Sequence, residues 1–413
     1  MGDIAIILLV SSLLGGLATR FGQPVVIGQI LTGVALGPTL LGRLPGDLTG
    51  RLFPQEVLPY LSVLAQVAIV TFMFVVGYEL NLGSLRMSSR TTLSVAAAAL
   101  LVPMGLGAGA VLLMPSAFTS VGEHDVDSRS FVLFMAVAVS ITALPVLAAI
   151  VRESGIAGTR ASVIALSAAG VMDVAAWTAL AAAMPGESHG LPAWQTVLLT
   201  AGLVLGGGLI VRPLLRWWIH RPGSMFTHQL PMAIVLAMGC AWATSELGLH
   251  AVFGGFLAGL LMPRRDGVPD LDVLRAMEGA AGLLLPLFFV VTGLSLNVGA
   301  IGRSSVLLLC LILLISVAGK LVPGYLASRL NGLDRRESAT IAALLNTRGL
   351  TELIALNVGL SAGIIHGRLF TVLVLMALIT TATASPLLTL LALPRRPASA
   401  SDEAVPSAGL NET

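Results

Sequence analysis

Asp173 is an ionisable residue inside a long apolar segment, with no other charged residue between Arg160 and Glu187. A carboxyl group at the centre of a bilayer costs about 2.5–3.5 kcal/mol on insertion scales, which indicates a functional role. A site that exchanges a proton for a cation needs such a group, since it can release a proton and then offer hard oxygen atoms to the ion. A structural, hydrogen-bonded aspartate is the alternative.

Lys320 is the second residue of this kind. It is the only lysine in the sequence, against 22 arginines. This usage indicates that the position requires an amine, because a buried amine can lose its proton whereas a guanidinium cannot. The alternative is a lysine that reaches the membrane surface, but Arg329 marks the predicted helix end about 13 Å away.

Two polar segments interrupt apolar stretches. The first contains Ser140, Thr142 and Pro145, and the proline removes a backbone donor from any helix that continues through it. An ordinary proline kink is the alternative to a functional break.

The second polar segment is Asn346-Thr347-Arg348-Gly349, which ends in glycine at the expected membrane depth. Glu352 follows Arg348 by four residues, so the two are predicted to share a helix face and to form an ion pair. This pair is interpreted mainly as structural.

Composition places these residues in a membrane protein. The chain has 413 residues, of which 56% are hydrophobic and 11% are charged, whereas soluble domains carry about 25% charged residues. The mean hydropathy is +0.94. Long apolar runs without period-2 alternation favour an all-α polytopic bundle over a β-barrel. Cys240 and Cys310 form no disulfide pattern, the six histidines show no metal-binding spacing, and neither nucleic acid nor a cofactor is implicated.

The hydropathy pattern predicts thirteen transmembrane helices, the first of them retained rather than cleaved. The predicted spans are residues 4–20, 24–42, 57–80, 92–114, 130–152, 160–184, 193–217, 229–247, 250–263, 278–297, 304–329, 337–361 and 368–393. With the N-terminus outside, the loops on the inside hold fifteen arginines and those on the outside hold five. The positive-inside rule therefore predicts an N-terminus outside and a C-terminus inside. The expected location is a bacterial-type cytoplasmic membrane.

An internal repeat is visible in the glycine-rich helices. Residues 74–83 are echoed by residues 289–299 with one insertion, and Gly28-x4-Gly33 is matched by Gly254-x4-Gly259. The offset is seven spans, an odd number, so the second copy crosses the membrane in the opposite direction. This predicts a transmembrane domain over residues 1–393, with repeat one at about 1–184, a linking helix at about 193–217 and repeat two at about 229–393. The two polar breaks then cross at equivalent positions, and residues 394–413 form a disordered tail.

The ordered set of motifs resembles the monovalent cation:proton antiporters of the second superfamily branch, which include sodium/proton and potassium/proton exchangers. The motifs are Gln23-Pro24-Val-Val-Ile-Gly28 with Gly37-Pro38, Thr142-Ala-Leu-Pro145-Val146, Ala-Ala-x-x-x-Asp173, Gly254-Gly-Phe256-Leu-Ala-Gly259, Gly319-Lys320, and Asn346-Thr347-Arg348-Gly349 with Glu352. The resemblance implies a lipid-embedded homodimer that is not an enzyme. It also implies a dimerisation domain and a six-helix core domain whose elevator-like movement exchanges Na⁺ or K⁺ for H⁺.

The resemblance also implies roles for single residues. Asp173 resembles the aspartate that binds cation and proton competitively, Lys320 the core-helix lysine, and Thr142 and Asn346 the polar groups at the helix crossing. The supporting residues are Ser140, Pro145, Met172, Thr347, Arg348 and Glu352.

Met172 departs from the family pattern, which commonly has Asp, Asn or Gln immediately before the transport aspartate. Lys320 then has only Asp173 as an obvious acidic partner, and the single transport carboxylate favours electroneutral exchange over electrogenic exchange. A sodium-coupled symporter of a small organic solute on the same type of fold is the alternative function. An intramembrane hydrolase is disfavoured, because no nucleophile stands beside a membrane-embedded histidine or second aspartate. The sequence does not decide between Na⁺ and K⁺.

Overall fold

The computed structural model describes residues 2–21, 23, 25–37, 39–43, 48–54, 56–79, 90–124, 128–156, 158–183, 201–219, 229–247, 250–264, 268–296 and 298–391. Within these ranges the chain forms helices and no β-strand. Six helices are long and apolar enough to cross a membrane. The all-α class expected from the sequence is therefore confirmed.

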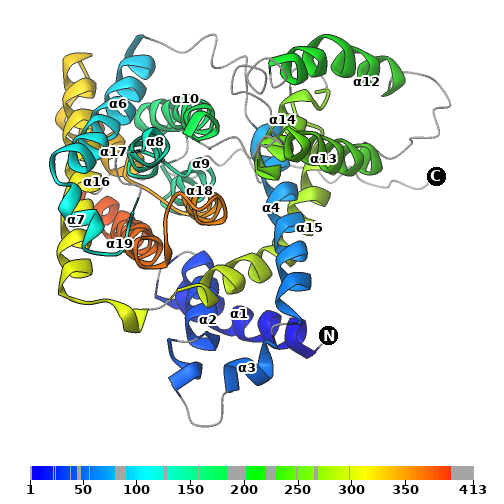
Figure 1. The fold of residues 1–413 in the computed structure, drawn as a ribbon. Helices are drawn as coiled ribbons and strands as arrows, with labels where there is room; N and C mark the ends of the chain where they lie inside the picture. The colour runs from blue at the N-terminus through cyan, green and yellow to red at the C-terminus, as the bar shows by residue number, and fades with distance from the viewer. Residues whose placement is uncertain are drawn as a thin grey trace, which may run out of the picture.

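The helices form two groups (Figure 1). One, here called the scaffold group, contains α1 (Gly2–Arg20), α2 (Val25–Leu36), η1 (Leu41–Arg43), α3 (Leu48–Leu52), α4 (Leu58–Glu79), η2 (Gly207–Val211), α12 (Arg212–Ile219), α13 (Gln229–Glu246), α14 (Ala251–Leu261) and α15 (Leu271–Leu294). The other, here called the core group, contains α6 (Arg90–Leu113), α7 (Pro115–Thr119), α8 (Arg129–Ala138), α9 (Leu144–Glu153), α10 (Arg160–Ala183), α16 (Arg303–Leu330), α17 (Arg335–Leu345), α18 (Leu350–Ser361) and α19 (Gly367–Leu391). A short turn of helix, η3 (Val298–Ala300), leads from α15 to α16.

Extensive helix packing occurs within each group. In the scaffold group α4 packs on α14 and α15, and α2 packs on α1 and α15. In the core group α16 packs on α6, α17 and α19, and α10 packs on α6, α8 and α17. Every extensively packed pair of described helices lies within one group, so the two groups are separate bodies joined by sparser contacts.

Glycines allow the scaffold helices to approach closely. A Cβ atom on Gly259 of α14 would lie 2.1 Å from the Phe74 carbonyl oxygen in α4. A Cβ atom on Gly33 of α2 would lie 2.7 Å from Gly293 Cα in α15. No side chain fits at either crossing, which accounts for two of the glycines in the predicted repeat.

Local capping sets several helix starts. Ser128 accepts a hydrogen bond from the Phe131 amide at the start of α8. Asp334 and Glu337 form a capping box at the start of α17. These side chains satisfy backbone donors that have no partner within the helix.

Some predicted features lie outside the described residues. They are Asn81, Gly83 and Asn297 of the repeated motif, the first part of the linking helix at 193–200, and the tail at 394–413.

Candidate functional site

Two interrupted helices meet inside the core group. The chain leaves helical conformation between α8 and α9, at residues 139–143, and again between α17 and α18, at residues 346–349. The Ala143 amide donates to the Thr347 carbonyl at 3.2 Å. The Thr142 hydroxyl donates to the Leu345 carbonyl at 3.0 Å. Both breaks fall in the predicted polar segments, and these bonds hold them together.

Pro145 does not form a kink within a continuous helix, which was the alternative to a break. It is the second residue of α9, in a first helical turn where a missing backbone donor leaves no hydrogen bond unmade. The break therefore precedes the proline, and the proline helps a new helix to start. Its side chain lies outside the described part of the structure.

Asp173 lies on α10 with 1% of its surface exposed. Neither carboxylate oxygen has a hydrogen-bond partner among the described residues. Lys320 and the backbone amide of Leu144, the first residue of α9, act on it electrostatically. A helix N-terminus favours a negative charge, so α9 begins where it can stabilise the carboxylate.

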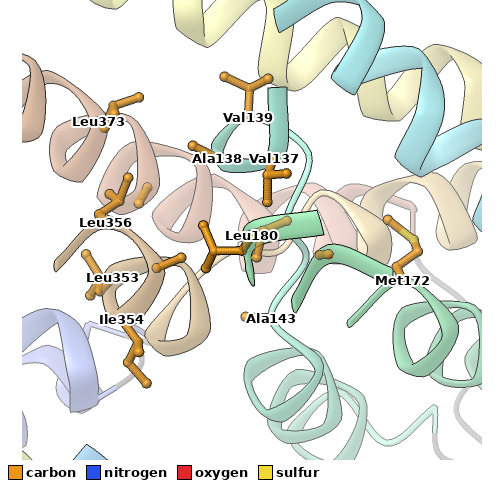
Figure 2. Packing of buried hydrophobic residues seen from close by; sticks show 14 of the residues in the cluster. Val137, Ala138, Val139, Ala143, Met172, Leu180, Leu353, Ile354, Leu356 and Leu373 are labelled. Atoms are coloured by element: carbon orange, nitrogen blue, oxygen red, sulfur yellow. The ribbon is translucent and has the colours of Figure 1, made fainter. Parts of the chain in front are cut away.

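A cluster of buried apolar side chains also packs against the breaks. Figure 2 shows Val139 and Ala143 at the first break in one cluster with Met172 and Leu180 of α10 and Leu353 of α18.

Lys320 lies on α16 with none of its surface exposed. Its ammonium donates to the Thr142 hydroxyl, which links α16 to the first break. The described residues show no ion pair between Lys320 and Asp173, its obvious acidic partner in the sequence. Thr142 is its direct contact instead.

Arg348 and Glu352 form the predicted ion pair. Nη1 of Arg348 lies 2.6 Å from Oε1 of Glu352, and both side chains are fully buried. The reason given from sequence was wrong, since Arg348 lies in the break and not on the helix of Glu352. From there its guanidinium also donates to the carbonyls of Ala138, at 2.9 Å, and Val139, which are at the end of α8.

The remaining predicted residues divide by their contacts. Asn346 caps the C-terminus of α17, and its side-chain oxygen Oδ1 has no partner within the described structure. Ser140 and Thr347 donate to carbonyls of their own chain segments, Val137 and Leu344. Their hydroxyl protons therefore bond to backbone carbonyls three residues earlier and do not link the two breaks.

Other buried polar atoms near the site were not predicted. The hydroxyls of Ser316, one turn before Lys320, and Thr351, beside Glu352, have no partner among the described residues. Asn357 on α18 donates to Thr292 of α15 at 3.0 Å. Single polar residues in apolar helices are the only sequence signal for them, and that signal does not indicate which neighbour they contact.

Glu123 and His366 form a partly buried hydrogen-bonded contact, with His366 Nδ1 2.8 Å from Glu123 Oε2. The Glu123 side chain is buried. The described residues contain no group of three or more His, Cys, Asp or Glu side chains arranged to hold a metal ion.

Two cavities lie between the scaffold and core groups. One, of about 420 Å³, is lined by Glu79, Glu278 and residues of α4, α9, α10 and α15. The other, of about 350 Å³, is lined by Gln66, His250, Asn357 and residues of α4, α15 and α18. An all-helical fold of apolar spans, with a buried acid in one helix group and cavities between the groups, defines a polytopic membrane transporter.

Comparison with known proteins identifies the family. Residues 6–392 match the family described as "Sodium/hydrogen exchanger, transmembrane", and the chain belongs to it. The family is one of antiporters, which confirms the resemblance of the motifs. The chain is 33% identical to the Na⁺/H⁺ antiporter NhaS4 of Synechocystis sp. over 94% of its own length and 95% of that protein.

Relatives differ in the cation that their names give. The chain is 31% identical to K⁺/H⁺ antiporter 1 of Saccharomyces cerevisiae, over 92% of its own length and 45% of the yeast protein. It likewise spans about half the length of the plant cation/H⁺ antiporters that it matches. The fold is similar to that of the sodium proton antiporter MjNhaP1 from Methanocaldococcus jannaschii, with a TM-score of 0.65, 16% identity, and coverage of 95% of this chain and 98% of that one.

Proposed function

We propose that this protein exchanges a monovalent cation, Na⁺ or K⁺, for H⁺ by alternating access, with Asp173 binding cation and proton in turn. The observation that carries the proposal is a fully buried carboxylate whose two oxygens have no hydrogen-bond partner among the described residues. Buried polar atoms in native proteins are nearly always satisfied, so these oxygens fit a site that a proton or a cation fills.

Neighbouring groups fit the same role. The free Oδ1 of Asn346 supplies a further neutral oxygen at the break that touches Thr142. Lys320 lies close enough to Asp173 to act on it electrostatically, although it does not pair with it directly. A cation therefore has acceptor atoms available at the site.

We further propose thirteen spans built as an inverted repeat, with the N-terminus outside and two crossing discontinuous helices. Equivalent glycines in the two copies make equivalent contacts, which supports this architecture. A Cβ atom on Gly28 would lie 2.2 Å from the Leu14 carbonyl oxygen, and one on Gly254 would lie 2.2 Å from that of Cys240. The packing of α2 on α1 and α15 has its counterpart in the packing of α14 on α13 and α4.

In this proposal the core group moves relative to the scaffold group. Two copies of the chain form a homodimer through their scaffold groups, within a bacterial-type cytoplasmic membrane. Dense packing within each group and sparser contacts between them support a movement of rigid bodies. The two cavities between the groups are the candidates for access paths from the two sides.

Proton flux in liposomes tests the function. Purified protein is reconstituted with a pH-sensitive dye inside the vesicles, and Na⁺, K⁺ and Li⁺ are added separately. We expect at least one cation alone to drive proton movement and Asp173→Asn to abolish it. Asp334→Asn, the same substitution at an exposed helix cap, is the matched control. Flux that requires an added organic solute would support a symporter instead, and wild-type flux in Asp173→Asn would refute the assignment.

A further inference from the structure

Asn357 of the core group donates a hydrogen bond to Thr292 of the scaffold group, with Nδ2 and Oγ1 3.0 Å apart. It therefore joins two helices, α18 and α15, that belong to different groups. The groups also meet through apolar contacts, such as the edge-to-face packing of Trp177 on Phe253, with ring centroids 5.9 Å apart. A hydrogen bond restricts the distance and angle between its two groups more narrowly than an apolar contact does.

We propose that the bond from Asn357 to Thr292 is a latch that holds the core group in the position described here and must break in each transport cycle. This inference rests on the proposed movement of the two groups. It assigns Asn357 and Thr292 a positioning role in transport, distinct from ion binding at Asp173.

The surroundings make this latch reversible. Asn357 lines the cavity of about 350 Å³ together with Gln66 and His250. A water molecule occupies about 30 Å³ in the liquid, so water in this cavity can solvate the amide when the bond opens. Asn357 Nδ2 also keeps its bond to the Leu353 carbonyl, at 2.9 Å, because that acceptor belongs to its own helix. Opening the latch therefore removes one neutral hydrogen bond and frees one N–H of Asn357, from which water in the cavity can accept a hydrogen bond.

Asn331 provides a matched control. Its Nδ2 donates to Ser94 Oγ at 3.1 Å and to the Ala327 carbonyl at 2.8 Å, the same pattern of one hydroxyl and one carbonyl four residues earlier. Both partner helices, α16 and α6, belong to the core group. Loss of the Ser94 hydroxyl therefore removes a comparable bond that does not cross between the groups.

The experiment measures the position of the core group directly. Spin labels are attached at Tyr60→Cys in α4 and Leu113→Cys in α6, which are exposed positions in the two groups, after Cys240→Ala and Cys310→Ala. Double electron–electron resonance in lipid nanodiscs then gives the populations of the distances between the labels. We expect Thr292→Val to reduce the population with the described geometry roughly two- to tenfold relative to the other, the net value of one neutral hydrogen bond.

Further variants decide the outcome. Asn357→Leu is expected to give a similar shift, and the double variant no more than either single one, because both remove the same bond. Ser94→Ala is expected to leave the populations unchanged. Unchanged populations in Thr292→Val, a single population in all variants, or an equal shift in Ser94→Ala would overturn the latch. Proton flux of the unlabelled wild type is measured in parallel, so failure of the proposed exchange is recognised separately.

Discussion

The ion pair of Arg348 and Glu352 provides a quantitative test of how the crossing of the two breaks is stabilised. Both side chains are fully buried, and their charged atoms are 2.6 Å apart. The two partners are not equivalent. Arg348 also donates to the carbonyls of Ala138 and Val139, whereas Glu352 Oε2 has no partner among the described residues.

This asymmetry predicts different losses of folding stability for Arg348→Gln and Glu352→Gln. Arg348→Gln leaves a buried carboxylate without its positive partner and also removes donors from the end of α8, so we expect a loss of about 3–5 kcal/mol of stability. Glu352→Gln leaves Arg348 with two backbone acceptors and supplies an amide oxygen as a third. We therefore expect a smaller loss, of about 1–3 kcal/mol.

Reversible unfolding in mixed detergent micelles, titrated with sodium dodecyl sulfate, measures these losses. Arg329→Gln is the control, since Arg329 is exposed and its Nη1 donates to the Leu333 carbonyl at 2.5 Å. We expect that control to match the wild type. Equal losses in the two test variants, a reversed order, or an Arg348→Gln variant as stable as the wild type would refute the reasoning.

Three further predictions concern transport and packing. Cation and proton contend for one carboxylate, so the apparent cation affinity is expected to fall about tenfold per pH unit on the acidic side of the Asp173 titration. An affinity that stays flat from about pH 5 to 8 would show separate sites. Exchange is expected to be electroneutral, because one transport carboxylate is present. A transport rate that follows a clamped membrane potential would contradict this prediction. Loss of that voltage dependence in Lys320→Gln would identify the lysine as a second proton carrier. Gly259→Ala is expected to abolish folded protein in size-exclusion chromatography, since its Cβ atom would lie 2.1 Å from the Phe74 carbonyl oxygen, whereas Gly279→Ala, with nothing within 4 Å, is expected to elute as the wild type does.

The candidate site was predictable from sequence because charges are rare in apolar spans. Asp173 stands out by the free-energy cost of placing a carboxyl group in the membrane, and Lys320 stands out as the only lysine in the sequence. Polar segments that contain proline or glycine indicate where helices stop. The structure places both helix breaks in those segments. Hydropathy and backbone chemistry depend on residues close in sequence, so they indicate directly where helices begin and end.

Contacts across the fold were less predictable. Periodicity did not show that Lys320 contacts Thr142 and not Asp173, or that Arg348 lies in a break and reaches the end of α8. The contact of Asn357 with Thr292 could not be predicted, because one amide in an apolar helix does not indicate which residue it contacts. Such contacts depend on helix rotation and packing, which hydropathy leaves undetermined.

Proton release on cation binding tests the central claim most directly. Detergent-solubilised protein in a weakly buffered solution is titrated with the cation that supports flux, while released protons and bound cation are measured together. At a pH where Asp173 is protonated, the account predicts one proton released per cation bound, and neither binding nor release in Asp173→Asn. Cation binding without proton release, or unchanged proton release in Asp173→Asn, would contradict it.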